Sequence, residues 1–190
     1  MPAALSGAFG LRKMRPPETI YTERLTLRVP RLSDAEAVYD TYARDPEVTR
    51  YLLWRPHQDV NETERFLLGC VAAWNDGVRF PWAITLRGRG RLVGMVEIRV
   101  NAFKADVGYV VAWPYWGRGI ASEALRPVVE WALAREGIYR VWALCDVENA
   151  ASARVLEKVG MRLEGKLRRN TVHPNISSEP RDSYCYAVVK

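Results

Sequence analysis

The sequence predicts an α+β (mixed α/β) fold, and three observations support this prediction. Seven segments with the apolar pattern of β-strands are spread among four with the pattern of helices, without any repeat or internal linker. Three of the strand patterns follow one another between residues 80 and 113, as in an antiparallel meander. The strongest amphipathic helix pattern, residues 120–137, stands between that meander and a further strand.

Composition places the chain among ordinary globular proteins. Of its 190 residues, 48% are hydrophobic and 26% are charged, which is enough apolar material for one core. Residues 1–20 are rich in Gly, Pro and Ala and show no period, so we expect a flexible N-terminal tail followed by a single domain over residues 21–190.

Charge and cysteine usage favour a cytoplasmic protein. No apolar run reaches the length of about 18 residues that a membrane helix needs, and the N-terminal charges follow the apolar stretch, unlike those of a signal peptide. Cys70, Cys145 and Cys185 are widely spaced and form no C-x-x-C pair, so we expect a reducing compartment and no metal. The net charge of +6 favours anionic partners such as a phosphorylated cofactor, an acidic protein or RNA.

The first strand and the first helix follow directly after the tail. Residues 22–30 alternate apolar and polar positions, as in a half-buried strand, and Pro30 ends the pattern. Residues 32–45 predict a helix in which Ser33 is the N-cap and Glu36 completes a capping box.

A second helix and the meander come next. Residues 61–77 predict a helix that Gly77 closes. The three strands of the meander are expected at residues 80–86, 91–100 and 106–113.

The C-terminal part combines two helices with three strands. In residues 120–137 apolar pairs recur every four residues, Gly137 supplies the stop, and Pro127 removes one backbone hydrogen bond inside the helix. A shorter helix at residues 151–160 is capped by Asn149. The strands are expected at residues 139–147, 161–169 and 182–189.

Gly117 and Gly119 flank Arg118 where the last strand of the meander turns into the strongest helix. The first N–H groups of such a helix are unpaired and, together with its dipole, favour an anion, most of all a pyrophosphate. A purely structural glycine turn is the alternative. A Walker loop is excluded because its lysine is absent, and a dinucleotide fingerprint because Ser122 stands where a third Gly or Ala belongs.

Two segments together resemble a known family. "ADVGYVVAWPYWGRGIASEAL" (105–125) and "VWALCDVENAASARVLEKVGM" (141–161) are similar to the acetyl-CoA-binding core of the GNAT N-acetyltransferases, specifically the RimJ/RimL branch that acetylates the N-termini of ribosomal proteins. The resemblance runs from about Thr22 to the end. It implies a GNAT fold: a central, mostly antiparallel twisted sheet of about seven strands, flanked by about four helices and splayed at the acetyl-CoA site.

The same resemblance implies the cofactor-binding residues. The pantetheine arm would pair with the backbone of Val110 and Ala112, and Asn149 would contact the pantetheine region while also starting its helix. The pyrophosphate would lie on the turn and the helix start, formed by Trp116, Gly117, Arg118, Gly119, Ile120, Ala121 and Ser122. Trp116 stands where the family signature has Gln or Arg, so we expect Arg118 to supply side-chain charge instead.

Catalysis in this family is a direct attack of an amine on acetyl-CoA in a ternary complex, without a metal. Leu156 stands where many members carry a tyrosine acid, whereas Ser152 matches the serine proton donor of the ribosomal branch; its alternative role is helix capping alone. Glu97, surrounded in sequence by apolar residues, and Asp106, at the start of the cofactor strand, are the candidate bases. The alternative for Glu97 is a solvent-facing residue.

The acceptor is the least constrained part. An α-amino group has a pKa of about 7.7–8.0 against about 10.4 for lysine, so a protein N-terminus needs only a weak base and is the favoured acceptor. The alternative acceptors are a polyamine, an amino acid or a drug. A non-catalytic sensor that binds acetyl-CoA without any acceptor is a further alternative. A homodimer is possible. Nucleic acid is expected only indirectly, through the ribosome. Tyr51, Trp54 and Trp82 are groove or core residues, and His173 lies in a loop that borders the acceptor site in the family, where a structural role is the alternative.

Overall fold

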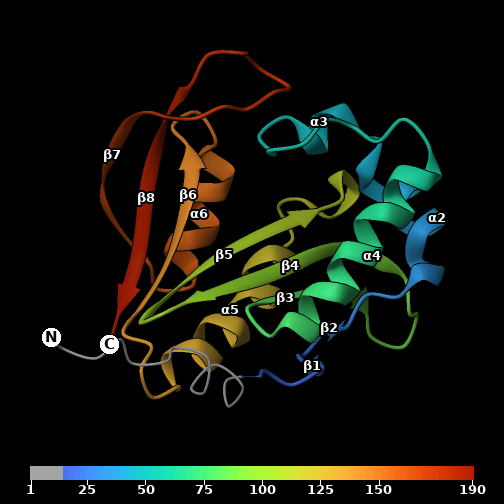
Figure 1. Cartoon of the computed structure of the whole chain (residues 1–190), viewed down its shortest axis with the longest axis horizontal. Coiled ribbons are helices and arrows are strands. Elements are labelled where there is room, and N and C mark those ends of the chain that lie inside the picture. Colours follow the sequence, from blue (N-terminus) through green and yellow to red (C-terminus); the bar gives the residue numbers. More distant parts are fainter. Residues whose placement is uncertain (1–14) are drawn as a thin grey trace, which may run out of the picture.

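The computed structural model describes residues 15–190, which form a twisted sheet with helices on both faces (Figure 1). The open sheet has eight strands in the order β1-β2-β3-β4-β5-β6-β8-β7. Every pair of neighbouring strands is antiparallel except β5 and β6. The mixed α/β fold with a mostly antiparallel sheet is therefore confirmed, with one strand more than expected.

The additional strand lies at the N-terminus of the described chain. β1 (Thr19–Tyr21) pairs with β2 (Leu25–Arg28), so the sheet begins inside the segment assigned to the tail. Three residues are too few to show a strand period, which explains why β1 was not predicted. The rest of the predicted tail, residues 1–14, lies outside the described residues.

The meander is confirmed. Its strands are β3 (Arg79–Leu86), β4 (Leu92–Asn101) and β5 (Lys104–Val111), and each runs antiparallel to the previous one. The C-terminal strands are β6 (Arg140–Asp146), β7 (Arg162–Thr171) and β8 (Arg181–Val189).

The segment expected to be one helix at residues 32–45 is broken. It consists of a 3-10 turn (Leu32–Asp34), α2 (Ala35–Val38) and a π-turn (Tyr39–Ala43), followed by the additional helix α3 (Pro46–Thr49). The N-cap assigned to Ser33 was wrong. The carboxylate of Asp34 accepts the backbone N–H of Arg31 instead, at 2.8 Å.

The next helix agrees with its prediction. α4 (Val60–Asp76) ends at Gly77, which adopts a left-handed conformation with φ 75°. Its N-cap is Asp59, whose side chain accepts the N–H of Glu62 at 3.0 Å.

The last two helices cover the face of the sheet opposite to α2 and α4. α5 (Ile120–Leu133) ends four residues before Gly137, and α6 (Ala150–Lys158) is capped by Asn149 as expected. One core lies between α5 and the sheet and includes Trp82 and Leu125, and the other lies below α4 and includes Met95. Within the described residues, no helix is both long and apolar enough to span a membrane.

The parallel pair is the feature that positions the site. β5 and β6 pair only over Lys104–Asp106 and Arg140–Trp142. Beyond that point the two strands diverge, as Figure 1 shows. Residues 107–111 therefore have no strand partner on the β6 side, which leaves backbone hydrogen-bonding groups in the middle of the sheet for another partner.

Candidate active site

The turn before α5 has the geometry of an anion cradle. Gly117 and Gly119 both have positive φ, 72° and 75°, a conformation that costs glycine little. The first backbone hydrogen bond at the N-terminus of α5 runs from the N–H of Glu123 to the carbonyl of Gly119, at 3.0 Å. No acceptor among the described residues meets the backbone N–H groups of residues 117–122. These free donors at a helix N-terminus fit a pyrophosphate.

Two side chains of the turn have different roles. The indole N–H of Trp116 donates to the carbonyl of Val111 at 2.6 Å, which fixes the turn to the end of β5 and uses the only donor of that side chain. The Arg118 guanidinium lies 5.9 Å from the ring centre of Tyr115, and no carboxylate of the described chain pairs with it. Arg118 thus has charge available for a phosphate whereas Trp116 has none, and the contact of Arg118 with a phosphate stays a prediction.

The backbone at the end of β5 is only partly available. The N–H of Ala112 donates to the carbonyl of Val93 at 2.9 Å, and its carbonyl accepts the N–H of Tyr115 at 3.0 Å. This does not support the pairing predicted for Ala112, because β4 takes its N–H and the short 3-10 turn after the strand takes its carbonyl. The carbonyl of Val110 also points toward β4, because it lies against the position that a Cβ of Gly94 would occupy, so the pairing predicted for Val110 is not supported either. The backbone groups that face the β6 side come from its neighbours within residues 107–111.

The start of α6 faces the same divergence of strands. The Asn149 side chain accepts the N–H of Ser152 at 3.1 Å. The Ser152 hydroxyl lies 2.7 Å from that of Tyr109, a residue of β5 that the sequence interpretation did not single out. Burial raises the pKa of Tyr109 well above its usual range, although the hydrogen bond to Ser152 opposes this effect. Leu156 is fully buried in the core.

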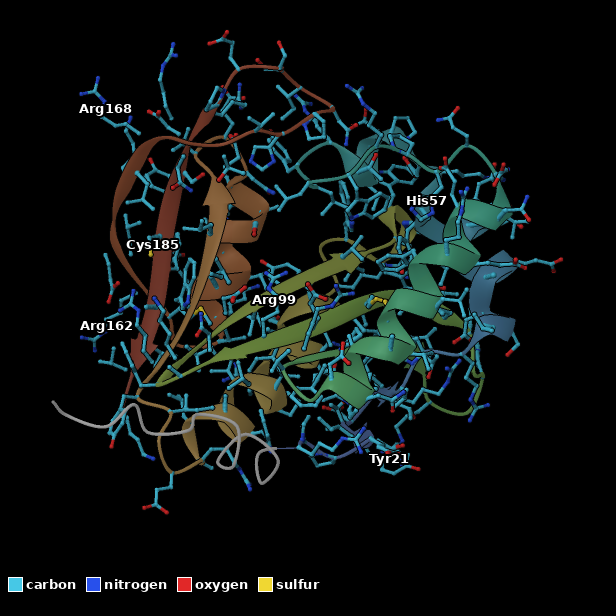
Figure 2. The ribbon with its side chains drawn as sticks, in the orientation of Figure 1. Tyr21, His57, Arg99, Arg162, Arg168 and Cys185 are labelled. Atoms are coloured by element: carbon cyan, nitrogen blue, oxygen red, sulfur yellow. The ribbon has the colours of Figure 1, made fainter. Side chains whose placement is uncertain are left out.

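Both candidate bases belong to one ionic cluster on the α4 face of the sheet. Arg99 donates to Glu97 and to Asp106, each at 2.6 Å, and Arg79 lies 3.2 Å from Glu97. Figure 2 shows Arg99 above β4 and β5. The apolar surroundings expected for Glu97 were wrong: its strand neighbours on the buried face point away, and the residues around its carboxylate are arginines.

The Glu97 and Asp106 side chains are about equally exposed, at 22% and 23%, but their cross-strand neighbours differ. Glu97 lies directly opposite Gly108, and a Cβ at that glycine would be 3.8 Å from its Oε1. Since Gly108 has no side chain, one flank of Glu97 stays open. Asp106 instead lies opposite Trp142 of β6.

Comparison with protein families matches residues 24–162 to the acetyltransferase (GNAT) domain. The chain belongs to the GNAT acetyltransferase family. An uncharacterised N-acetyltransferase of Bacillus subtilis (strain 168), YoaA, is 30% identical over 172 residues, which cover 89% of this chain and 95% of that protein.

Two solved structures extend this similarity. A GNAT-family acetyltransferase from Bacillus anthracis has 29% identity and a TM-score of 0.78, over 90% of this chain and 98% of that one. Mycobacterium smegmatis RimJ in complex with CoA-disulfide has 26% identity and a TM-score of 0.76, over 87% and 81% of the two chains. The family resemblance is confirmed, and the RimJ/RimL branch is supported. The chain is an acetyl-CoA-dependent N-acetyltransferase of the GNAT type.

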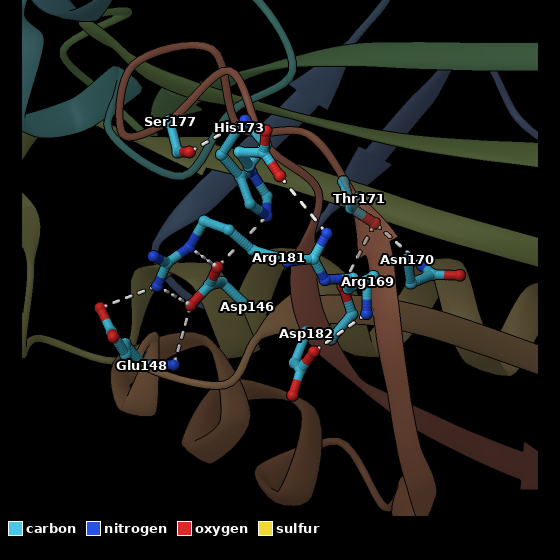
Figure 3. A network of polar contacts seen from close by, with 11 residues as sticks. Asp146, Glu148, Arg169, Asn170, Thr171, His173, Ser177, Arg181 and Asp182 are labelled. Atoms are coloured by element: carbon cyan, nitrogen blue, oxygen red, sulfur yellow. Dashed lines mark hydrogen bonds and ion pairs between the residues drawn. The ribbon is translucent and has the colours of Figure 1, made fainter.

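A second polar network of this GNAT enzyme lies at the end of β6 (Figure 3). Asp146 is buried and accepts two hydrogen bonds from Arg181, at 2.6 and 3.1 Å. His173 is 5% exposed, and its Nε2 is 3.7 Å from the Asp146 carboxylate. Burial lowers the pKa of His173, although the charge of Asp146 acts in the opposite direction.

The loop that carries His173 connects the two halves of the molecule. The side-chain amide of Asn175 donates to the carbonyls of Thr49 and Trp54, both at 2.7 Å. His173 and Tyr51 meet edge to face, with ring centres 6.3 Å apart. These contacts fix the loop between β7 and β8 against the segment around α3, and they support the structural role that was the alternative for His173. Trp82 is fully buried, so it belongs to the core and not to a groove.

Proposed function

We propose that this GNAT acetyltransferase acetylates the α-amino group of protein N-termini. The observation that carries the proposal is the divergence of β5 and β6 beside a turn with free N–H groups, because it provides strand backbone and an anion cradle in one place. In the proposed site the turn residues 116–122 hold the pyrophosphate of acetyl-CoA, with Arg118 adding charge. The β6-facing backbone of residues 107–111 pairs with the pantetheine arm, and Asn149 borders it.

The bound cosubstrate would supply a thioester whose carbonyl the amine attacks directly. Glu97 takes a proton from the amine, either in contact with it or through a water molecule, and Asp106 acts with Glu97 through their shared partner Arg99. Ser152 gives its hydroxyl proton to the departing sulfur. Tyr109, hydrogen bonded to Ser152, can replace that proton, and its raised pKa keeps it protonated.

Two arguments support an N-terminal acceptor over a lysine. The carboxylates of Glu97 and Asp106 already accept hydrogen bonds from Arg99, so little of their accepting capacity remains for an amine and each can serve only as a weak base. A weak base suffices for an α-amino group, since a sizeable fraction of it is neutral near pH 7, whereas a lysine is almost fully protonated. The similarity to RimJ agrees with this choice.

A coupled assay would test the proposal. Release of free CoA from acetyl-CoA would be followed by thiol detection with N-terminal peptides, the same peptides with a blocked N-terminus and an internal lysine, spermine, and free amino acids. The Asn149→Ala and Ser152→Ala variants would be compared with Ser33→Ala, a control at an exposed serine.

We expect release with free N-terminal peptides only, reduced in the first two variants and unchanged in the control. Release with spermine or amino acids alone would contradict the protein acceptor and make the chain a small-amine acetyltransferase. Tight acetyl-CoA binding without release for any amine would contradict catalysis in favour of a sensor.

A further inference from the structure

The turn between β1 and β2 is tied to the first turn of α5 through one carboxylate. The Glu123 Oε1 atom accepts the hydroxyl of Thr22 at 2.6 Å and the backbone N–H of Arg24 at 2.8 Å. Its Oε2 atom accepts the side-chain N–H of Arg24, also at 2.6 Å. These residues are about a hundred positions apart in the sequence, so the fold alone brings them together.

The position of Glu123 conflicts with the proposed cofactor site. A carboxylate in the first turn of a helix interacts well with the helix dipole, but the phosphates of CoA would occupy the same region and be repelled by it. Burial alone would raise the pKa of Glu123. The hydrogen bonds from Thr22 and Arg24 outweigh that effect and hold its pKa below the usual range, so the group is ionised.

Arg24 is placed to remove this conflict. Its Nη1 donates to the carbonyl of Arg118 at 3.0 Å, and its Nη2 lies 3.5 Å from the point that a Cβ of Gly119 would occupy. The guanidinium therefore lies against the glycine turn while it pairs with Glu123. The side chain of Arg24 is 47% exposed and that of Glu123 only 16%, so the positive partner is the one that a ligand would meet.

The same residues line an open surface groove of about 470 Å³. It brings together the β1–β2 turn, the glycine turn and the outer face of α5, and its lining includes Thr22, Arg24, Gly119, Ser122, Glu123 and Arg126. A phosphorylated ligand on the turn would thus border the Arg24–Glu123 pair directly.

We propose that Arg24 is a cofactor-positioning residue: it neutralises Glu123 and holds the Arg118 carbonyl, so that the turn presents N–H groups and positive charge to the phosphates of CoA. This inference rests on the proposed location of the pyrophosphate. A purely structural role for Arg24 would be different. In that case Arg24 would only attach the β1–β2 turn to α5, and its loss would weaken the binding of ligands with and without phosphates equally.

The test measures CoA affinity by isothermal titration calorimetry, and the apparent KM for S-acetylpantetheine, which lacks the phosphates. The variants are Arg24→Ala, Glu123→Gln and the double variant. Arg44→Ala is the matched control, because Arg44 also pairs with a carboxylate, Asp40, but on the opposite face of the sheet. Thermal denaturation of each variant monitors folding.

We expect Arg24→Ala to raise the Kd for CoA about tenfold at low salt, as for one unscreened charge contact near the surface. The KM for S-acetylpantetheine should change less than about twofold, since no phosphate is present to meet the carboxylate. The double variant should recover to within about threefold of the parent, because the repelling charge is gone, and the loss in Arg24→Ala should shrink at high salt.

Three results would overturn the inference while leaving the proposed function in place. They are an equal loss for CoA and S-acetylpantetheine, a double variant that binds CoA as weakly as Arg24→Ala, and an unchanged Kd in Arg24→Ala. If the parent enzyme itself fails to bind CoA, the proposed cofactor site is wrong and this inference falls with it.

Discussion

The hydroxyl oxygens of Tyr109 and Ser152 lie 2.7 Å apart and join the middle of β5 to the first turn of α6. The two residues come from opposite sides of the divergence between β5 and β6, where the cosubstrate is proposed to bind. The Tyr109 hydroxyl also lies 3.2 Å from the Ser152 carbonyl oxygen, so it is held by two polar contacts to one residue. A strand tyrosine thereby controls the orientation of the proposed proton donor.

Removing the hydroxyl of Ser152 or of Tyr109 should slow turnover without weakening cofactor binding. We expect Ser152→Ala to lower kcat by about tenfold, at the low end for general acids because a thiol is a good leaving group. Tyr109→Phe should lower kcat by a smaller factor and leave the KM for acetyl-CoA unchanged, because Tyr109 acts through Ser152. Steady-state kinetics of the two single variants and the double variant provide the measurement. If the two residues act as a unit, the double variant is no slower than Ser152→Ala, whereas multiplicative losses would show independent roles.

Gly94 controls the approach of β4 to β5 beside the proposed cofactor strand. A Cβ at this position would lie 2.2 Å from the carbonyl oxygen of Val110 and 3.1 Å from the Cα of Val111, both backbone atoms that cannot rotate away. Gly94→Ala should therefore displace β5, destabilise the protein by about 1–3 kcal/mol and weaken acetyl-CoA binding. Gly165→Ala is the control, because no atom lies within 4 Å of its added methyl group. Urea unfolding and calorimetry check both variants, and a fully stable Gly94→Ala protein would contradict the close approach.

The open flank of Glu97 distinguishes it from Asp106 as the base. We expect Glu97→Gln to reduce kcat/KM about a hundredfold at pH 7, within the range for general bases, and to recover part of it at pH 9, where an α-amine is neutral without help. Asp106→Asn should cost much less, since its carboxylate lies opposite Trp142. Rate profiles over pH 6–9 with an N-terminal peptide are the measurement. A larger and pH-rescued loss in Asp106→Asn would exchange the two roles.

Sequence patterns predicted a helix or strand well where its apolar residues recur regularly or a glycine marks its end. The four-residue repeat of α5, the Gly77 stop of α4 and the three strands of the meander all depend on neighbours in sequence. The start of the segment after β2 was predicted wrongly because it depends on an ion pair with the preceding strand. Asp34 binds Arg28 of β2 at 2.6 Å, and a capping rule that considers only the residues next to Ser33 does not include this contact.

The site was predictable only in its backbone part. The glycine turn and the cap at Asn149 are visible as motifs, whereas the Tyr109–Ser152 and Arg24–Glu123 contacts join residues 43 and 99 positions apart. No period or spacing encodes such pairs. The arginines around Glu97 could have been suspected, since Arg99 is two residues along the same strand and must share its face.

The two histidines should set the pH dependence of stability between pH 5 and 7. The chain has only His57 and His173. Burial lowers the pKa of both, against the opposing charges of Glu62 and Asp59 at His57 and of Asp146 at His173, where Arg181 adds to the lowering. A lowered pKa in the folded state means that the unfolded chain binds more protons below about pH 6.5, so the free energy of unfolding falls as the pH decreases.

Asp146 adds a second, more acidic step. Burial alone would raise its pKa, but hydrogen bonds from Arg181 and from the N–H of Glu148 outweigh burial and hold the pKa below its ordinary value of 3.8. Its stabilising contribution is therefore complete above about pH 4 and is lost as the pH falls through the lowered pKa.

Urea unfolding at intervals from pH 7 to pH 3 separates the two steps. His173→Gln should flatten part of the slope between pH 7 and 5, and the His57→Gln/His173→Gln double variant should flatten nearly all of it. Both should change the acid step only slightly, because Arg181 and the N–H of Glu148 lower the pKa of Asp146 more than His173 does. Asp146→Asn should lower stability at pH 7, because Arg181 loses its buried carboxylate partner, and should remove much of the decline below pH 4. A slope between pH 7 and 5 that persists in the double variant would show that other groups, and not the buried histidines, bind the protons on unfolding.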